Sequence, residues 1–157
     1  MKADHPGSRF RHLAAPFLAL LFMPIAVDAA EGDRAVRVEP ARTIFEAGEP
    51  IEVLVLNGSS APVFVANCGS LQPEVFVEEH FEALPPTPCT EEGPARILPP
   101  GESRLTLPVP PELVGKTGRV ALIYGTGCIE GRSLSRGRCA DFATVRSGNF
   151  LLRAPVP

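Results

Sequence analysis

Short apolar stretches separated by turn residues constrain the fold of this chain most strongly. The 157 residues include 18 prolines and 14 glycines, which interrupt the chain too often for long helices. Between them, apolar residues recur at every second position, most clearly at Ile51, Val53 and Val55. A period of two is that of a half-buried β-strand, whereas an amphipathic helix repeats every 3.6 residues. The sequence therefore predicts strands and turns, and no helix.

The expected strands can be placed along the chain from this alternation. They cover residues 34–40, 51–56, 62–66, 102–109 and 118–125, with one or two further pieces within 142–153. Residues 74–81 are rich in Val and Phe, but their glutamates break the alternation. Residues 45–50 and 57–60 are predicted turns, and the proline-rich residues 84–100 are expected to form a long irregular connection without regular sheet. Residues 51–56 and 118–125 are predicted to be central strands, because both are densely apolar.

About seven short strands in one domain indicate an all-β, antiparallel, immunoglobulin-like sandwich. The chain contains no Trp, so the cysteine–tryptophan–cysteine core of antibody domains is excluded. A generic sandwich is expected instead, stabilised by disulfides.

Two motifs carry a family resemblance. They are Phe45-x-x-Gly48-Glu49-x-Ile51-x-Val53-x-Val55-x-Asn57 and Pro99-Pro100-Gly101-Glu102-Ser103. This pattern resembles that of small secreted bacterial immunoglobulin-like β-sandwich domains. The resemblance implies the fold more than a function, because such domains occur as envelope proteins, as parts of adhesins and as some protease inhibitors.

The first 29 residues have the pattern of a secretory signal peptide. Basic residues at the start precede an apolar run at 13–27, and Val27 and Ala29 suit signal peptidase. The run is shorter than the roughly 20 residues that span a bilayer. We therefore expect residues 1–29 to be removed, residues 30–157 to form a single domain without a membrane span, and the product to be periplasmic or secreted from a bacterium.

All four cysteines, Cys68, Cys89, Cys128 and Cys139, follow that segment. In an oxidising compartment an even number of cysteines indicates disulfides. Three pairings are possible, and we favour Cys68–Cys89 and Cys128–Cys139 because each closes a local loop. No Cys-x-x-Cys motif is present, so neither a redox-active pair nor a zinc site is expected.

The residues available for catalysis are few. His80 is the only histidine after the signal segment, and it follows Glu78 and Glu79, which makes a solvated strand end more plausible than a general base. The glutamates at 78, 79, 82, 91 and 92 lack the spacing of a calcium loop. No nucleophile elbow or zinc-protease motif occurs. We expect no catalytic residue, no metal and no cofactor.

Charge excludes one class of partner. The net charge is −3 for the whole chain and −4 once residues 1–29, with three basic and two acidic residues, are removed. Such a balance gives no general attraction to nucleic acid.

The segment from Cys128 to Cys139 is the candidate partner-binding element, because it presents Arg132, Arg136 and Arg138 within a disulfide-closed loop. Three interpretations are open: an ordinary solvated hairpin tip, a loop that docks an anionic partner, and the reactive loop of a serine-protease inhibitor. The sequence favours an exported, non-catalytic binding or envelope-structural module, and another envelope or extracellular protein is the candidate partner. The alternative is a serine-protease inhibitor acting through the Cys128–Cys139 loop.

Overall fold

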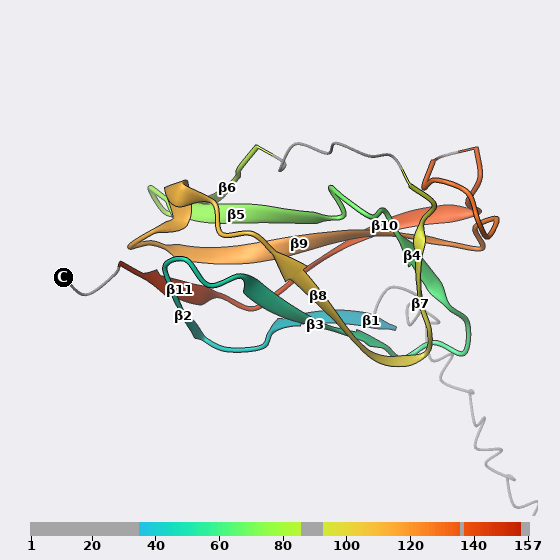
Figure 1. Ribbon diagram of the computed structural model, residues 1–157, viewed down its shortest axis with the longest axis horizontal. Coiled ribbons are helices and arrows are strands. Elements are labelled where there is room, and N and C mark those ends of the chain that lie inside the picture. The colour runs from blue at the N-terminus through green and yellow to red at the C-terminus, as the bar shows by residue number, and fades with distance from the viewer. Residues whose placement is uncertain (1–34, 86–92, 136, 155–157) are drawn as a thin grey trace, which may run out of the picture.

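Eleven strands and one short 3₁₀ turn make up the part of the chain that the computed structural model describes, residues 35–85, 93–135 and 137–154 (Figure 1). No α-helix occurs in these residues, so the prediction of an all-β chain is confirmed. The strands form two hydrogen-bonded sheets. No helix in this part of the chain is long and apolar enough to cross a membrane.

The smaller sheet has three antiparallel strands. They are β1 (Val36–Pro40), β3 (Ile51–Asn57) and β8 (Gly101–Leu107), in the order β1-β3-β8. The central strand is β3, as predicted, and Ile51, Val53 and Val55 are fully buried on one of its faces. The other face carries Leu54 and Leu56, which are half-buried.

The larger sheet is built around the ten-residue strand β9 (Thr117–Thr126). One edge of β9 pairs with β10 (Asp141–Arg146) and then β11 (Phe150–Arg153), and the other edge pairs with β5 (Leu71–Val77) and β4 (Val63–Val65). Three short strands extend the sheet: β6 (His80–Ala83) beside β5, β7 (Arg96–Leu98) beside β4, and β2 (Ile44–Glu46), which runs parallel to β11. The prediction that residues 118–125 form a central strand is confirmed.

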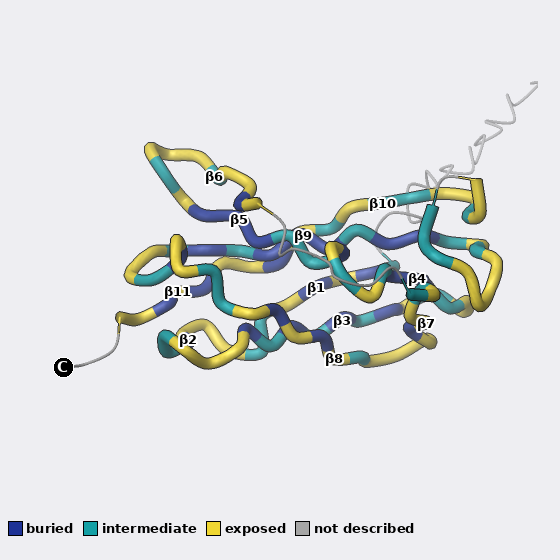
Figure 2. Tube along the Cα trace, turned by 45° about the horizontal axis from the view of Figure 1, so that its top comes forward, coloured by how far each residue is buried: buried dark blue, intermediate teal, exposed yellow. Residues whose placement is uncertain are grey.

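The core lies between the two sheets, and along β1 and β3 the buried, dark-blue positions of Figure 2 alternate with more exposed ones. Phe45 and Phe150 meet edge to face in it, with ring centroids 5.4 Å apart. The 3₁₀ turn η1 (Pro111–Leu113) adds Leu113, which is fully buried. Gly118 leaves room for these groups, since an added Cβ would lie 2.9 Å from Leu113 and 3.1 Å from Phe150. Each large apolar side chain so buried stabilises the fold by roughly 1.5–3 kcal/mol.

Two sequence predictions are wrong at short strands. Residues 84–100 were expected to lack regular sheet, but they contain β7, whose three residues pair with β4. Residues 45–50 were expected to be a turn, but Phe45 and Glu46 belong to β2 and only residues 47–50 turn, around Gly48 with a φ of +95°. Both strands are three residues long and depend on a partner distant in sequence, so the local alternation is too short to reveal them.

The ambiguous residues 74–81 form a tight hairpin between β5 and β6. Its turn is Glu78-Glu79, and both residues have left-handed φ values, +43° and +73°. Two-residue hairpins of this kind usually carry Asn-Gly, because those residues tolerate positive φ. The sequence therefore lacks the usual signal for the turn, and the cross-strand pair of Phe76 and Phe81, with ring centroids 5.1 Å apart, holds the strands together instead.

The predicted turn after β3 is organised by Asn57, which is buried. Its Nδ2 donates to the carbonyl oxygen of Ala61 at 2.9 Å, and its Oδ1 accepts from the backbone N–H of Ser59 at 3.1 Å. Nδ2 also donates to the carbonyl oxygen of Leu98 in β7 at 3.4 Å. The Asn side chain thus replaces backbone partners that the turn lacks and ties it to the larger sheet.

Candidate functional site

The connection from β9 to β10, residues 127–140, holds the three arginines singled out by the sequence and is called the arginine loop below. It lies at one end of the larger sheet, at the right of Figure 1. The predicted Cys128–Cys139 disulfide is confirmed and closes the loop at its base, with Cα atoms 3.8 Å apart. Cys68 is disulfide-bonded as well, and its predicted partner Cys89 lies outside the described residues.

Gly125 in β9 allows the disulfide to pack on the outward face of the sheet. A Cβ added there would lie 2.7 Å from the sulfur of Cys128 and 2.9 Å from that of Cys139. It would also approach Leu134 of the loop to 3.1 Å. Only glycine leaves this space. Gly125 is the last residue of the predicted strand, where a glycine usually indicates a turn, so the sequence gives no clear signal of this close approach.

The same end of the sheet buries an aromatic ring on its outward face. Phe64 pairs with Gly125 across β4 and β9 and is 4% exposed, although its neighbours Val63 and Val65 are the ones that face the core. At the other end of the outward face, Phe76 is 45% exposed. The arginine loop therefore stands over a covered, apolar part of the sheet, which gives it a rigid base.

Backbone hydrogen bonds fix the path of the loop. The carbonyl oxygen of Arg132 accepts from the N–H of Ala95 at 2.8 Å, which ties the tip to the segment before β7. The carbonyl oxygen of Arg138 accepts from the N–H of Ile129 at 2.9 Å. The Arg138 guanidinium donates to the hydroxyl of Ser133 at 2.8 Å. The two described arginines thus have their carbonyl oxygens occupied by the protein itself, while Arg136 lies outside the described residues.

Exposed groups of both kinds, cationic and apolar, lie on this loop. Arg132 and Arg138 are exposed, and Ile129 is the most exposed large apolar residue among those described, at 59%. Next to the loop is a hollow of about 460 Å³, lined by Ile123, Leu134, Ser135, Phe142, Ala143 and Thr144. The loop therefore carries exposed cationic and aliphatic side chains, and two of its other residues, Leu134 and Ser135, line an open hollow.

The other sequence candidates do not assemble into a site. His80 is exposed at the start of β6, with its Nε2 3.0 Å from Oε1 of Glu82 and its Nδ1 3.2 Å from the Glu78 carbonyl oxygen. Within the described parts of the chain, no three His, Cys, Asp or Glu residues are grouped so that they could hold a metal ion. Glu91 and Glu92, which belonged to the acidic cluster, lie outside the described residues.

One buried charge was not anticipated from the sequence. The Glu74 side chain in β5 is 7% exposed and accepts hydrogen bonds from Nε of Arg119 and, at 3.1 Å, from Nε of Arg146. The Arg119 guanidinium lies over the ring of Phe81, 3.9 Å from its centroid. These residues come from four strands, so their proximity follows from strand register and has no local sequence signal. The Glu74 carboxylate is paired with two guanidinium groups, so we interpret this cluster as stabilising the fold.

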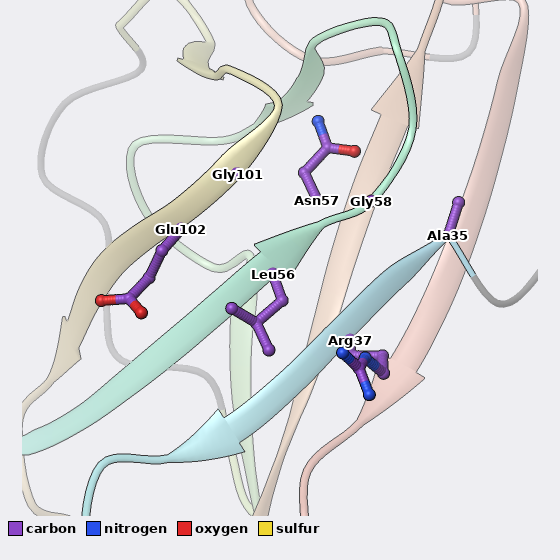
Figure 3. Close-up of a pocket in the computed structure, with 7 residues that line it drawn as sticks. All are labelled: Ala35, Arg37, Leu56, Asn57, Gly58, Gly101 and Glu102. Carbon is purple, nitrogen blue, oxygen red and sulfur yellow. The ribbon is translucent and has the colours of Figure 1, made fainter.

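A second hollow, of about 700 Å³, lies on the smaller sheet (Figure 3). Arg37, Leu56 and Glu102 line it from the three adjacent strands β1, β3 and β8. Asn57 and Gly58 close one end, where the N–H of Gly58 donates to the carbonyl oxygen of Ala35 at 2.6 Å. Its floor carries charges of opposite sign on either side of a leucine.

Comparison with known proteins adds no assignment: no family model, no curated protein and no solved structure matches this chain.

Proposed function

We propose that the chain is an exported, non-catalytic binding module with an immunoglobulin-like fold, which engages an anionic group of its partner through the arginine loop. The observation that carries this proposal is the anchoring of the loop. A disulfide, the packing around Gly125 and the Ala95–Arg132 hydrogen bond hold it in place, while Arg132 and Ile129 remain exposed.

The immunoglobulin-like assignment is supported by strand order. In such sandwiches strands A, B and E share one sheet, and strands C, F and G share the other. If the interrupted pairs β4/β5 and β10/β11 each count as one strand, β1, β3 and β8 take the A, B and E places. The pairs β4/β5 and β10/β11 then flank β9 in the C, G and F places.

Anion binding follows from the chemistry of the exposed arginines. A guanidinium offers donors in a planar fork that matches a carboxylate or a phosphate. Arg132 forms no side-chain hydrogen bond or ion pair with another described residue, and among the described residues the Arg138 guanidinium donates a hydrogen bond to one neutral hydroxyl, that of Ser133. Because the loop is anchored at its base and at Arg132, less conformational entropy is lost on binding. The nearby hollow can receive an apolar group that accompanies the anion.

The alternative, a serine-protease inhibitor, is less well supported. A protease must bring the scissile carbonyl oxygen into its oxyanion hole. The carbonyl oxygens of Arg132 and Arg138 are both engaged by backbone N–H groups of the protein. Either arginine would have to break such a bond to be presented, which opposes tight inhibition at those two positions.

A tetraglutamate peptide serves as the probe of anion binding, followed by NMR of the oxidised protein. We expect salt-sensitive shifts confined to residues 129–135 and to the arginine side chains of the loop. The double variant Arg132→Gln/Arg138→Gln should lose them, whereas Arg42→Gln, which removes an exposed arginine paired with Glu49 at 3.0 Å, should keep them. Equal shifts in the loop double variant would contradict the proposal.

An inhibition assay with trypsin distinguishes the anion-binding function from the protease-inhibitor function. We expect the protein, at stoichiometric amounts, to leave trypsin active. Tight inhibition that Ala replacement of a single loop arginine abolishes would instead establish the inhibitor function.

A further inference from the structure

The outward face of the smaller sheet carries charges that alternate in sign in both directions. Two rows cross its three strands: Arg37, Leu56 and Glu102 in one, and Glu39, Leu54 and Arg104 in the next. Both rows point away from the core, since Val36, Val38, Val53, Val55 and Leu105 between them are buried in it. We call these six residues the alternating face.

Some of these charged side chains lack partners among the residues that the structure describes. The Arg104 guanidinium lies 3.1 Å from Glu52 and 3.6 Å from Glu102. The side chains of Arg37 and Glu39 form no hydrogen bond or ion pair with other described residues. Both are exposed on the edge strand β1, and between the charged strands lie the half-buried Leu54 and Leu56. The face thus has an apolar centre and a charged rim, the arrangement of a protein interface.

From this pattern we infer that the alternating face binds a second copy of the same chain. Consider a twofold axis that lies between the two copies, parallel to the sheet, perpendicular to the strands and midway between the two rows. It places each row over the other row of the partner copy, so the charge at every position meets its opposite. The pairs are Arg37 with Glu39 and Glu102 with Arg104, each formed twice, while Leu54 packs on Leu56.

A twofold axis along the strands would also match these charges, but it places Glu52 opposite its own copy. The axis across the strands avoids that repulsion, so it is the arrangement that we propose. Faces that complement themselves in this way are what closed twofold dimers require. The hollow of about 700 Å³ beside Leu56 would receive the Leu54 row of the other copy.

The dimer should be weak and sensitive to salt. Three short strands offer less area than the roughly 1,200 Å² that stable interfaces bury, and exposed ion pairs contribute little each. Charge interactions are screened beyond about 10 Å at 0.1 M salt and about 3 Å at 1 M. Because the arginine loop lies on the other sheet, a dimer would present two such loops and gain avidity for a multivalent partner.

Sedimentation velocity of the processed chain over a wide concentration range tests this inference. We expect a concentration-dependent dimer at low salt that is lost at 1 M salt. Arg37→Glu should weaken association by roughly tenfold, because each pair occurs twice and attraction becomes repulsion. Lys116→Glu, the same charge change at an exposed residue outside the alternating face, should have little effect.

Two double variants identify the axis. Arg37→Glu/Glu39→Arg restores opposite charges only under the proposed axis, so it should recover the dimer. Arg37→Glu/Glu102→Arg restores them only under an axis along the strands, so it should stay monomeric. Three results would each overturn the proposal. The wild-type protein could be monomeric at every concentration, the dimer could be unaffected by Arg37→Glu, or only the second double variant could recover the dimer.

Discussion

Gly125 lies so close beneath Cys128 that a Cβ on the glycine would come within 2.7 Å of the cysteine sulfur. The strand and the disulfide therefore fit together only because this position has no side chain. The contact sets the height of the arginine loop above the sheet, and it links a strand residue of the fold to the geometry of the candidate site.

Replacing Gly125 by Ala should therefore destabilise the oxidised protein by roughly 1–3 kcal/mol, as overpacking does. The free energy of unfolding in urea, measured without reductant, tests this. Gly137→Ala in the same loop is the matched control, because an added Cβ there meets nothing within 4 Å. Equal costs at the two positions would contradict the packing that we describe.

A replacement in the Glu78-Glu79 turn should raise the stability of the protein. Replacing the pair by Asn-Gly should stabilise the protein by about 1 kcal/mol, because those residues adopt the positive φ values at lower cost. Thermal and urea unfolding measure the gain. Gln-Gln is the control, since it removes both charges and leaves the backbone cost unchanged. A similar gain from Gln-Gln would attribute the effect to charge repulsion instead.

The buried carboxylate of Glu74 should be important for stability. Its removal in Glu74→Ala leaves Arg119, whose side chain is 26% exposed, without its counter-charge, and breaking such a buried pair costs about 3–5 kcal/mol. Glu49→Ala, which breaks the exposed pair with Arg42, should cost less than about 1 kcal/mol. Urea unfolding of both variants compares their free energies of unfolding directly. Similar losses of free energy would show that Glu74 contributes no more to stability than an exposed ion pair does.

The predicted export of the chain can be tested by its mass. The basic start, the apolar run at 13–27 and the small residues Val27 and Ala29 predict removal of the first 29 residues. Intact-mass analysis of protein recovered from a bacterial periplasm should show that loss and no free thiol. Recovery of the full-length chain in the membrane fraction would contradict the prediction.

Much of the fold could be predicted because β-strand alternation is a local property. A buried strand is indicated by Ile51, Val53 and Val55 alone, wherever its partner strands lie, since successive side chains point to opposite faces. The disulfide between Cys128 and Cys139 was predictable for a related reason, because the two residues are close in sequence. The strands β2 and β7 escaped prediction, as each is too short to show a period.

Only the tertiary structure decided which side chains meet across strands. Glu74 pairs with Arg119 and Arg146, which lie 45 and 72 residues away in sequence, because of the registers of β5, β9 and β10. Arg37, Leu56 and Glu102 form a row for the same reason. A shift of register by one residue would send each of these side chains to the opposite face. The sequence by itself determined where most of the longer strands occur and that cysteines close the arginine loop, since those depend on neighbouring residues. Sheet pairing fixed the charged surfaces, because register depends on residues far apart in the chain.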